Sequence, residues 1–231
     1  MQQLKLHGAF RSGTNYVRAL LELNYNVTVV ANSGGWKHAP VPATFDLDHG
    51  WPIVGVVKDP YSWLVSLWRH AEGSVHIDCG GTWRHFLRGP ITITHAGKAE
   101  VPLYRFASPV DYWNAMAVNL LSIRDRASVV RYEDALADPV LVCKHLAGQF
   151  GLTPREGEFT FVERRTRNIV DRPRQTVEQY ETDEEFDSTW YTEQRYRDEW
   201  SRRDRRWVSS RLDPDAIRSL RYGDSNQRSR T

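Results

Sequence analysis

A glycine-bearing turn between a short strand and a helix, close to the start of the chain, most constrains the fold. Residues 4–6 alternate apolar and polar side chains as a strand does, and Val17, Leu20 and Leu21 recur at the spacing of one helix face. The turn between them, residues 7–16, reads HGAFRSGTNY. In a strand–turn–helix of this kind, backbone N–H groups and the positive end of the helix dipole point into one concavity. The sequence therefore predicts a phosphate site at this turn.

The turn differs from the phosphate loop of nucleotide kinases, which reads G-x-x-x-x-G-K-[ST]. Gly8 and Gly13 have the right separation, but Thr14 and Asn15 stand where the lysine and the hydroxyl ligand of Mg²⁺ belong. Arg11 instead supplies a cation with a planar fork of donors. The turn therefore suits a phosphate bound without a metal, although many turns of this shape are only connections.

Length and composition limit the class of protein. The 231 residues are enough for one sizeable core, and we expect a single domain over residues 1–223 followed by a disordered polar tail, residues 224–231. A net charge of +2 gives no reason to expect nucleic acid as a partner. No apolar run reaches the roughly 18 residues of a membrane span. With two cysteines and no signal peptide before the turn, the sequence predicts a cytoplasmic protein.

Strand and helix patterns alternate through the first 152 residues. They predict strands at residues 26–31, 51–58 and 128–132, and helices that begin at Pro60 and Pro139 or cover residues 110–123. This alternation predicts an α/β fold of three layers, with a central, mainly parallel sheet flanked by helices as in P-loop NTPases. Residues 72–108 are expected to be largely irregular, with one helical piece at 82–87. The C-terminal third is expected to form short helices packed over the edge of the sheet.

Polar residues stand where a predicted strand ends, and ligands of open parallel sheets bind at such carboxyl ends. Lys58 ends the strand at 51–58, and Ser66 lies eight residues later in the next helix. A cation and a hydroxyl so arranged can hold a second phosphate, although a solvated lysine and a surface serine give the same pattern. Asp59 and Pro60 are expected to open that helix as its cap and its first residue.

Two further groups are expected at the same edge of the sheet. His38 follows the strand at 26–31 and is a candidate general base, although most single histidines are only surface or core residues. Tyr132 ends the strand at 128–132 and offers a flat face to a nucleotide base. Glu133 and Asp134 follow it, and capping of the next helix is the simpler interpretation of these two carboxylates.

In this order and spacing, the four groups resemble the cytosolic-type sulfotransferases that use 3′-phosphoadenosine 5′-phosphosulfate (PAPS). The 5′-phosphosulfate loop of that family, [KR]-[ST]-G-T after a strand, is matched by residues 11–14. Its 3′-phosphate motif is an Arg followed by Asn/Asp-Pro, with a Ser eight residues after the Arg. Residues 58–60 and Ser66 match it, with Lys58 in place of the Arg. Lysine gives a point charge instead of a bidentate fork.

The other motifs of the family follow in the same order. Its catalytic histidine, in a K-x-H-x-P segment, is matched by residues 38–40, with Trp36 where the lysine belongs, and His38 lies 20 residues before Lys58. Residues 132–134 match its adenine-side Tyr-Glu-Asp, and Tyr16 takes the place of an aromatic residue that flanks adenine. The match covers about residues 1–152, and residues 212–223 look like the end of bacterial members. The C-terminal R-K-G clasp is not found, and its candidate replacements are Arg164, Arg165, Arg167 and Arg172.

The resemblance implies transfer of a sulfuryl group from PAPS to a hydroxyl or amine of a small-molecule or glycan acceptor. The product nucleotide would be 3′-phosphoadenosine 5′-phosphate (PAP), and no metal is required. His38 is implied as the general base and Arg11 as a catalytic cation. The cofactor-binding residues implied are Arg11, Ser12, Gly13, Thr14, Asn15, Tyr16, Lys58, Ser66 and Tyr132.

The acceptor pocket is expected from residues 72–108 and from the aromatic C-terminal third. Its candidate residues are Lys37, His76, Trp83, His85 and Tyr104. Neither the identity of the acceptor nor the oligomeric state is predicted. Two other classes stay open: a metal-dependent nucleotide or small-molecule kinase of the P-loop class, and a non-catalytic nucleotide-binding protein. The second would be favoured if His38 were buried away from Arg11.

Overall fold

The computed structural model describes residues 2–30, 35–40, 50–71, 74, 76–94, 104–166 and 176–223. The expected tail, residues 224–231, lies outside the described residues, as do Arg167 and Arg172. Among the helices of the described residues, none is both long enough and apolar enough to cross a membrane.

The centre of the fold is a four-stranded parallel sheet. It consists of β1 (Gln2–His7), β2 (Val27–Val30), β3 (Ile53–Val57) and β7 (Ala127–Arg131) in the order β2-β1-β3-β7. Every neighbouring pair is parallel, as the expected α/β fold requires. The chain leaves β1 toward β2 on one side and returns to β3 on the other. The carboxyl ends of β1 and β3 therefore form the switch point at which open α/β sheets bind ligands.

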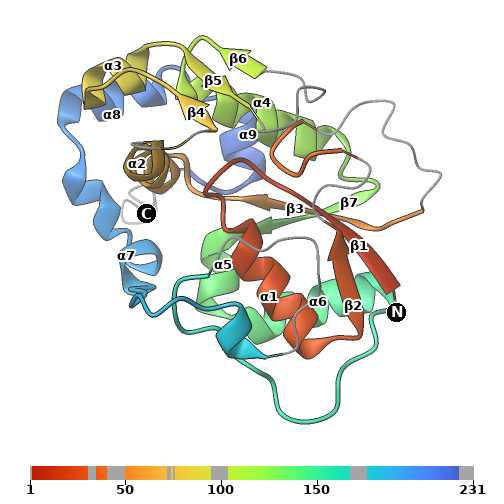
Figure 1. Ribbon diagram of the computed structural model, residues 1–231. Coiled ribbons are helices and arrows are strands. Elements are labelled where there is room, and N and C mark those ends of the chain that lie inside the picture. Colours follow the sequence, from red (N-terminus) through yellow and green to blue (C-terminus); the bar gives the residue numbers. More distant parts are fainter. Residues whose placement is uncertain are drawn as a thin grey trace, which may run out of the picture.

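Helices cover both faces of this sheet (Figure 1). Leu4, Leu6 and Val54 pack in one apolar cluster with α1 (Thr14–Asn24), α5 (Tyr132–Ala137) and α6 (Pro139–Phe150). Ile53 and Val57 belong to a second cluster with α2 (Pro60–Ala71) and α4 (Pro109–Ser122). Neighbouring strand residues thus point to opposite, fully covered faces, which is why the strands read as continuous apolar runs. The three-layer α/β architecture predicted from the sequence is confirmed.

The segment expected to be largely irregular contains a second, small sheet. β4 (Ile77–Asp78), β5 (Ile91–Ile93) and β6 (Tyr104–Phe106) pair in antiparallel fashion, and α3 (Trp83–Arg88) lies between β4 and β5 in the chain. The expectation for this segment was wrong in this respect. Strands of two or three residues are too short to show an alternating pattern, so nothing in the sequence marks them.

The C-terminal third forms short helices, as expected: η2 (Val177–Gln179), α7 (Thr189–Thr192), η3 (Arg195–Glu199), α8 (Arg202–Ser209) and α9 (Pro214–Ser219). It begins beside α1, where the hydroxyl of buried Tyr180 donates a 2.6 Å hydrogen bond to Glu22. It then runs past α5 to α2, along the carboxyl side of the sheet (Figure 1). This path lays α7 and the residues before it over the switch point.

Candidate functional site

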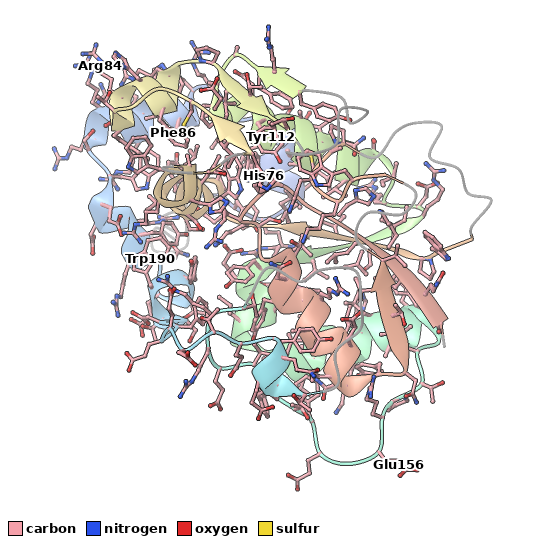
Figure 2. The ribbon with its side chains drawn as sticks, viewed as in Figure 1. His76, Arg84, Phe86, Tyr112, Glu156 and Trp190 are labelled. Atoms are coloured by element: carbon pink, nitrogen blue, oxygen red, sulfur yellow. The ribbon has the colours of Figure 1, made fainter. Side chains whose placement is uncertain are left out.

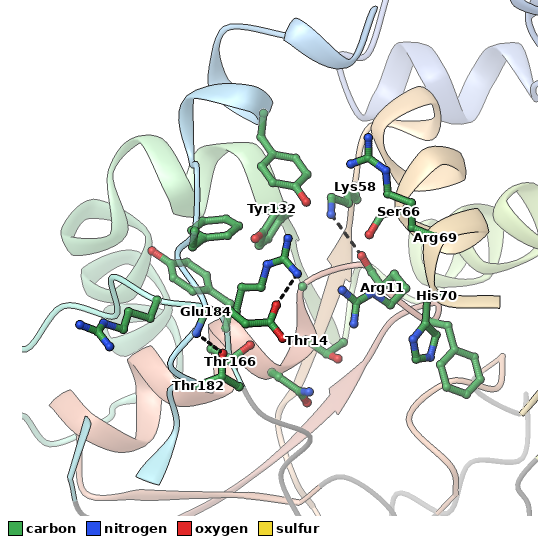
Figure 3. Close-up of a pocket in the computed structure, with 18 of the residues that line it drawn as sticks. Arg11, Thr14, Lys58, Ser66, Arg69, His70, Tyr132, Thr166, Thr182 and Glu184 are labelled. Carbon is green, nitrogen blue, oxygen red and sulfur yellow. Dashed lines mark hydrogen bonds and ion pairs between the residues drawn. The ribbon is translucent and has the colours of Figure 1, made fainter. Parts of the chain in front are cut away.

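A cavity of about 760 Å³ opens at the carboxyl ends of β1 and β3. The turn after β1, the start of α1, the inner face of α2, Tyr132 and the C-terminal segment around α7 form its walls (Figure 3). His76, just before β4, and Trp190, in α7, also line the cavity (Figure 2). Its walls therefore come from parts of the chain that are distant in sequence. Of the expected site residues, it is lined by Arg11, Gly13, Thr14, Asn15, Tyr16, Lys37, His38, Lys58, Ser66, His76 and Tyr132.

The turn after β1 needs both of its glycines. A Cβ at Gly8 would lie 2.6 Å from the carbonyl oxygen of Val56. Gly13 has a φ of +95°, and a Cβ there would lie 2.1 Å from the ring of Tyr132. Arg11 also has a positive φ, 64°, which an arginine adopts only where its surroundings hold it. The turn therefore folds tightly against Val56 and Tyr132 at the amino end of α1.

Buried aromatic side chains hold the turn from behind. The indole Nε1 of Trp63 donates a 2.6 Å hydrogen bond to the carbonyl oxygen of Phe10. The N–H of Phe10 donates to the hydroxyl of Tyr112, which in turn donates to the carbonyl oxygen of His38, at 3.1 and 3.0 Å. Because both aromatic side chains are fully buried, the backbone positions of residues 10 and 38 are fixed relative to each other.

His38 is held in one orientation and one tautomer. Its Nδ1 lies 2.8 Å from the carbonyl oxygen of Gly8, an atom that only accepts hydrogen bonds, so Nδ1 carries the proton and Nε2 a lone pair. The ring stacks on Phe10 at a centroid distance of 4.1 Å, and the ring of Trp36 meets it edge-on. Burial, followed by the charge of Lys37, lowers the pKa of His38 well below its ordinary value of 6.5. At neutral pH the ring is an unprotonated base that lines the same cavity as Arg11.

Lys58 lies buried in an aromatic cage. Its Nζ is 4.5 Å from the centroid of the Tyr132 ring and 4.1 Å from that of Tyr191, and it donates a 3.3 Å hydrogen bond to the carbonyl oxygen of Arg11. Its backbone is fixed as well, since Trp113 Nε1 donates to its carbonyl oxygen at 2.9 Å. Burial lowers the pKa of this ammonium. Cation–π contacts with two tyrosine rings stabilise the charge, and the nearby carboxylate of Glu133 favours it as well.

Aromatic rings line the cavity next to this cage. The rings of Tyr16 and Tyr191 both meet Tyr132 edge-on, at centroid distances of 5.8 and 5.3 Å. Phe186 stacks on Tyr191 at 5.7 Å. Tyr16 and Tyr132 are expected from the sequence, whereas Phe186 and Tyr191 come from the C-terminal segment. The four rings form a flat-walled region suited to a purine base.

Buried Asp59 and half-buried Glu133 form an acidic pair near Lys58. Asp59 Oδ1 accepts from the N–H groups of Tyr61 and Ser62, at 2.9 and 3.2 Å, as the expected cap of α2. The sequence suggested that Glu133 caps the next helix, but it does not cap α5. It accepts instead from the backbone N–H of Asp59, at 2.9 Å, and from the hydroxyl of Tyr222, at 3.0 Å. Burial and the neighbouring Glu133 raise the pKa of Asp59 from 3.8 to about 6.

Comparisons with family models, with curated proteins and with solved structures found no match to this chain. Support for a function therefore comes from the residues of the cavity and their arrangement.

Several expected site residues lie elsewhere. The side chain of Ser12 faces a small internal void under the turn, and its buried hydroxyl has no hydrogen-bond partner among the described residues. Trp83, His85 and Tyr104 are not among the residues that line the cavity. Trp83 packs against Trp68, Phe86 and Trp200, the side chain of His85 is exposed on α3, and Tyr104 lies half-buried in β6.

Among the other lining residues, some were candidates from the sequence and others were not expected. Arg69 and His70 follow Ser66 by three and four positions on α2, and this spacing in the sequence was the available signal. Arg164 and Arg165, two of the four candidate clasp residues, also line the cavity, and Arg165 forms an ion pair with Glu184 across its wall (Figure 3). The aromatic residues around α7 belong to the C-terminal third that was expected to contribute to the pocket, whereas nothing in the sequence marked Glu184. Among the described residues, no group of three or more His, Cys, Asp or Glu side chains is arranged to hold a metal ion.

Proposed function

We propose that this protein is a sulfotransferase that moves a sulfuryl group from PAPS to a hydroxyl or amine of a small-molecule or glycan acceptor. The observation that carries the proposal is the shared cavity. A phosphate-type turn, a caged cation beside a serine, a group of tyrosine rings and an unprotonated histidine all face one space of about 760 Å³. The turn would bind one phosphate of the nucleotide, the cation and the serine a second phosphate, and the tyrosine rings its base. The histidine would contact the acceptor.

The residues of the cavity fit such a nucleotide. A Cβ at either glycine would collide with its surroundings, so the turn can adopt this tight form at the start of α1 only with glycine at both positions. The first N–H groups of α1 have no partner within the helix, and a negatively charged phosphate is their natural acceptor. Lys58 and Ser66 supply a second cation and a hydroxyl, and Tyr16 and Tyr132 supply apolar faces for the base.

His38 and Arg11 would carry the chemistry. The nucleotide supplies an activated sulfuryl group when it is bound. His38 Nε2 takes the proton of the acceptor as the acceptor oxygen or nitrogen bonds to sulfur, and the bond between sulfur and the phosphate oxygen breaks. Arg11 and the N–H groups at the start of α1 balance the charge that this phosphate gains. As in phosphoryl transfer, alignment and charge stabilisation matter more than covalent help from the protein.

An assay of sulfuryl transfer tests this proposal. The wild-type protein is incubated with PAPS labelled in the sulfur, in EDTA, with a phenol, a sugar alcohol or an amine as acceptor. We expect label in at least one acceptor class and PAP in equal amount, both lost in His38→Ala. Label that leaves PAPS no faster than in buffer, with every acceptor class, would contradict the proposal. Phosphate transfer from ATP that depends on Mg²⁺ would support the P-loop kinase instead.

A further inference from the structure

Lys58 has little capacity left for a phosphate. An ammonium has three donors, and one of those of Lys58 is used by the carbonyl oxygen of Arg11 at 3.3 Å. A hydrogen bond with the side chain of Tyr191 also contributes to its pKa. The rings of Tyr132 and Tyr191 lie against the ammonium and restrict its movement. Lys58 therefore supplies charge to this part of the cavity but not the pair of parallel hydrogen bonds that a guanidinium gives to a phosphate.

A guanidinium lies one helical turn further along. Arg69 follows Ser66 by three positions on α2, so the two side chains share one face of the helix, and both line the cavity. Figure 3 shows Lys58, Ser66 and Arg69 together on the same side of that cavity. None of the sequence motifs includes Arg69.

Two contacts hold Arg69 while leaving part of its donor fork open. Its guanidinium lies over the ring of Trp190, 5.3 Å from the centroid. One nitrogen, Nη2, contacts both carboxylate oxygens of Glu199, at 2.9 and 2.8 Å. Trp190 Nε1 donates to the same carboxylate at 3.0 Å and fixes it in turn. No hydrogen bond of Nε or Nη1 of Arg69 is found among the described residues. These two nitrogens lie on different edges of the guanidinium, and each can donate a hydrogen bond to an anion.

We infer that Arg69 binds the second phosphate of the nucleotide and supplies the hydrogen-bond donors that Lys58 lacks. This inference rests on the proposed function and extends it to a residue outside the sequence motifs. Ser66 gives this subsite a hydroxyl, Lys58 a buried positive charge and Arg69 the donors of its Nε and Nη1. The three together select a nucleotide that carries a phosphate on its ribose in addition to the one at the turn.

Calorimetric titration with two nucleotides tests the inference. PAP carries both phosphates, whereas adenosine 5′-phosphate lacks the one on the ribose 3′ oxygen. Arg69→Gln should weaken PAP binding about 10- to 100-fold, the usual range for a hydrogen-bonded charge, and change adenosine 5′-phosphate binding less than about threefold. The side chain of Arg69 is 59% exposed, so the variant should fold, and its melting temperature is recorded alongside.

Glu199→Gln is the matched control. It removes the charge of the ion pair but leaves Arg69 over Trp190, so PAP binding should stay within about threefold of wild type. Equal weakening of PAP by both variants would overturn the inference, because Arg69 would then act only by holding α7. Equal weakening of both nucleotides by Arg69→Gln, or no weakening, would overturn it as well. A wild-type protein that does not prefer PAP to adenosine 5′-phosphate would overturn the proposed function itself, and that result is visible before any variant is made.

Discussion

His38 and Gly8 are joined by a 2.8 Å contact between Nδ1 and the backbone carbonyl oxygen. Gly8 is the first residue after β1, so the same turn that we propose binds a phosphate also orients the histidine. The stacked ring of Phe10, from the centre of that turn, completes the arrangement. His38 and the turn are thus held together, and a change in the turn should disturb both of the roles proposed for them.

Replacing His38 should separate chemistry from binding. His38→Ala removes the base, which typically contributes about 10²- to 10⁴-fold to a rate, while the groups expected to hold the nucleotide remain. We predict this loss in turnover with PAP affinity within about threefold of wild type, measured by transfer of labelled sulfur and by calorimetry. Because burial keeps the pKa of His38 below 6.5, the wild-type rate should fall only as the pH drops below that value. A variant that loses rate and affinity equally would rule out the assignment of His38 as the base.

Gly13→Ala should damage the turn. The substitution places a Cβ at a φ of +95° and 2.1 Å from the ring of Tyr132, so the ring or the turn must shift. The left-handed backbone alone costs about 1–2 kcal/mol for a residue with a Cβ. We expect a lower melting temperature and loss of nucleotide binding. Gly148→Ala in α6 is the control: nothing lies within 4 Å of its Cβ, and it should stabilise the helix by about 0.5–1 kcal/mol.

Tyr180→Phe should loosen the C-terminal segment from α1. The Tyr180 hydroxyl donates at 2.6 Å to Glu22, and both side chains are fully buried, so the variant leaves a buried carboxylate short of one donor. This should cost about 1–3 kcal/mol in the free energy of unfolding, measured with urea. Tyr104→Phe is the matched control, because no hydrogen bond of the Tyr104 hydroxyl is found among the described residues. Equal stability of the two variants would show that the Tyr180–Glu22 contact does not anchor the segment.

The stability of Asp59→Asn relative to wild type should depend on pH. The folded-state pKa of Asp59 is raised from 3.8 to about 6, so the folded protein binds more protons than the unfolded chain between these values. The contribution of Asp59 to stability is therefore present at low pH and lost as the pH rises through about 6. An asparagine keeps the capping oxygen without the charge. The melting temperature of the variant minus that of wild type should rise from pH 4 to pH 6 and then level off, and a constant difference would contradict the raised pKa.

The parts of the fold that follow from local pattern were predictable. The strand at 51–58 proved to be Ile53–Val57, and the helix at 110–123 proved to be Pro109–Ser122, because continuous apolar runs and helical spacing mark buried elements directly. Strands β4 to β6 were not predictable, since two or three residues carry no period and depend on partners elsewhere in the chain. Trp83 was misplaced for a related reason: an aromatic residue beside polar ones fits a pocket and a core cluster equally well.

The same distinction holds for the site. Lys58 and Tyr132 directly follow β3 and β7, and Arg11 and His38 lie in the segments after β1 and β2. The topology of a parallel sheet brings these strand ends together. Tyr191 and Glu184 reach the cavity only because the C-terminal segment crosses the switch point, a long-range contact that no spacing in the sequence records. Which way a side chain points within a turn was equally hidden, as Ser12 shows.

Nucleotide preference in the absence of metal tests the central claim most directly. The wild-type protein is titrated by thermal shift with PAP in EDTA, and with ATP with and without Mg²⁺. We predict that PAP in EDTA stabilises the protein most, by roughly 2.7 kcal/mol at one hundred times its dissociation constant. Stronger stabilisation by ATP with Mg²⁺ than by PAP would contradict it and favour a metal-dependent kinase.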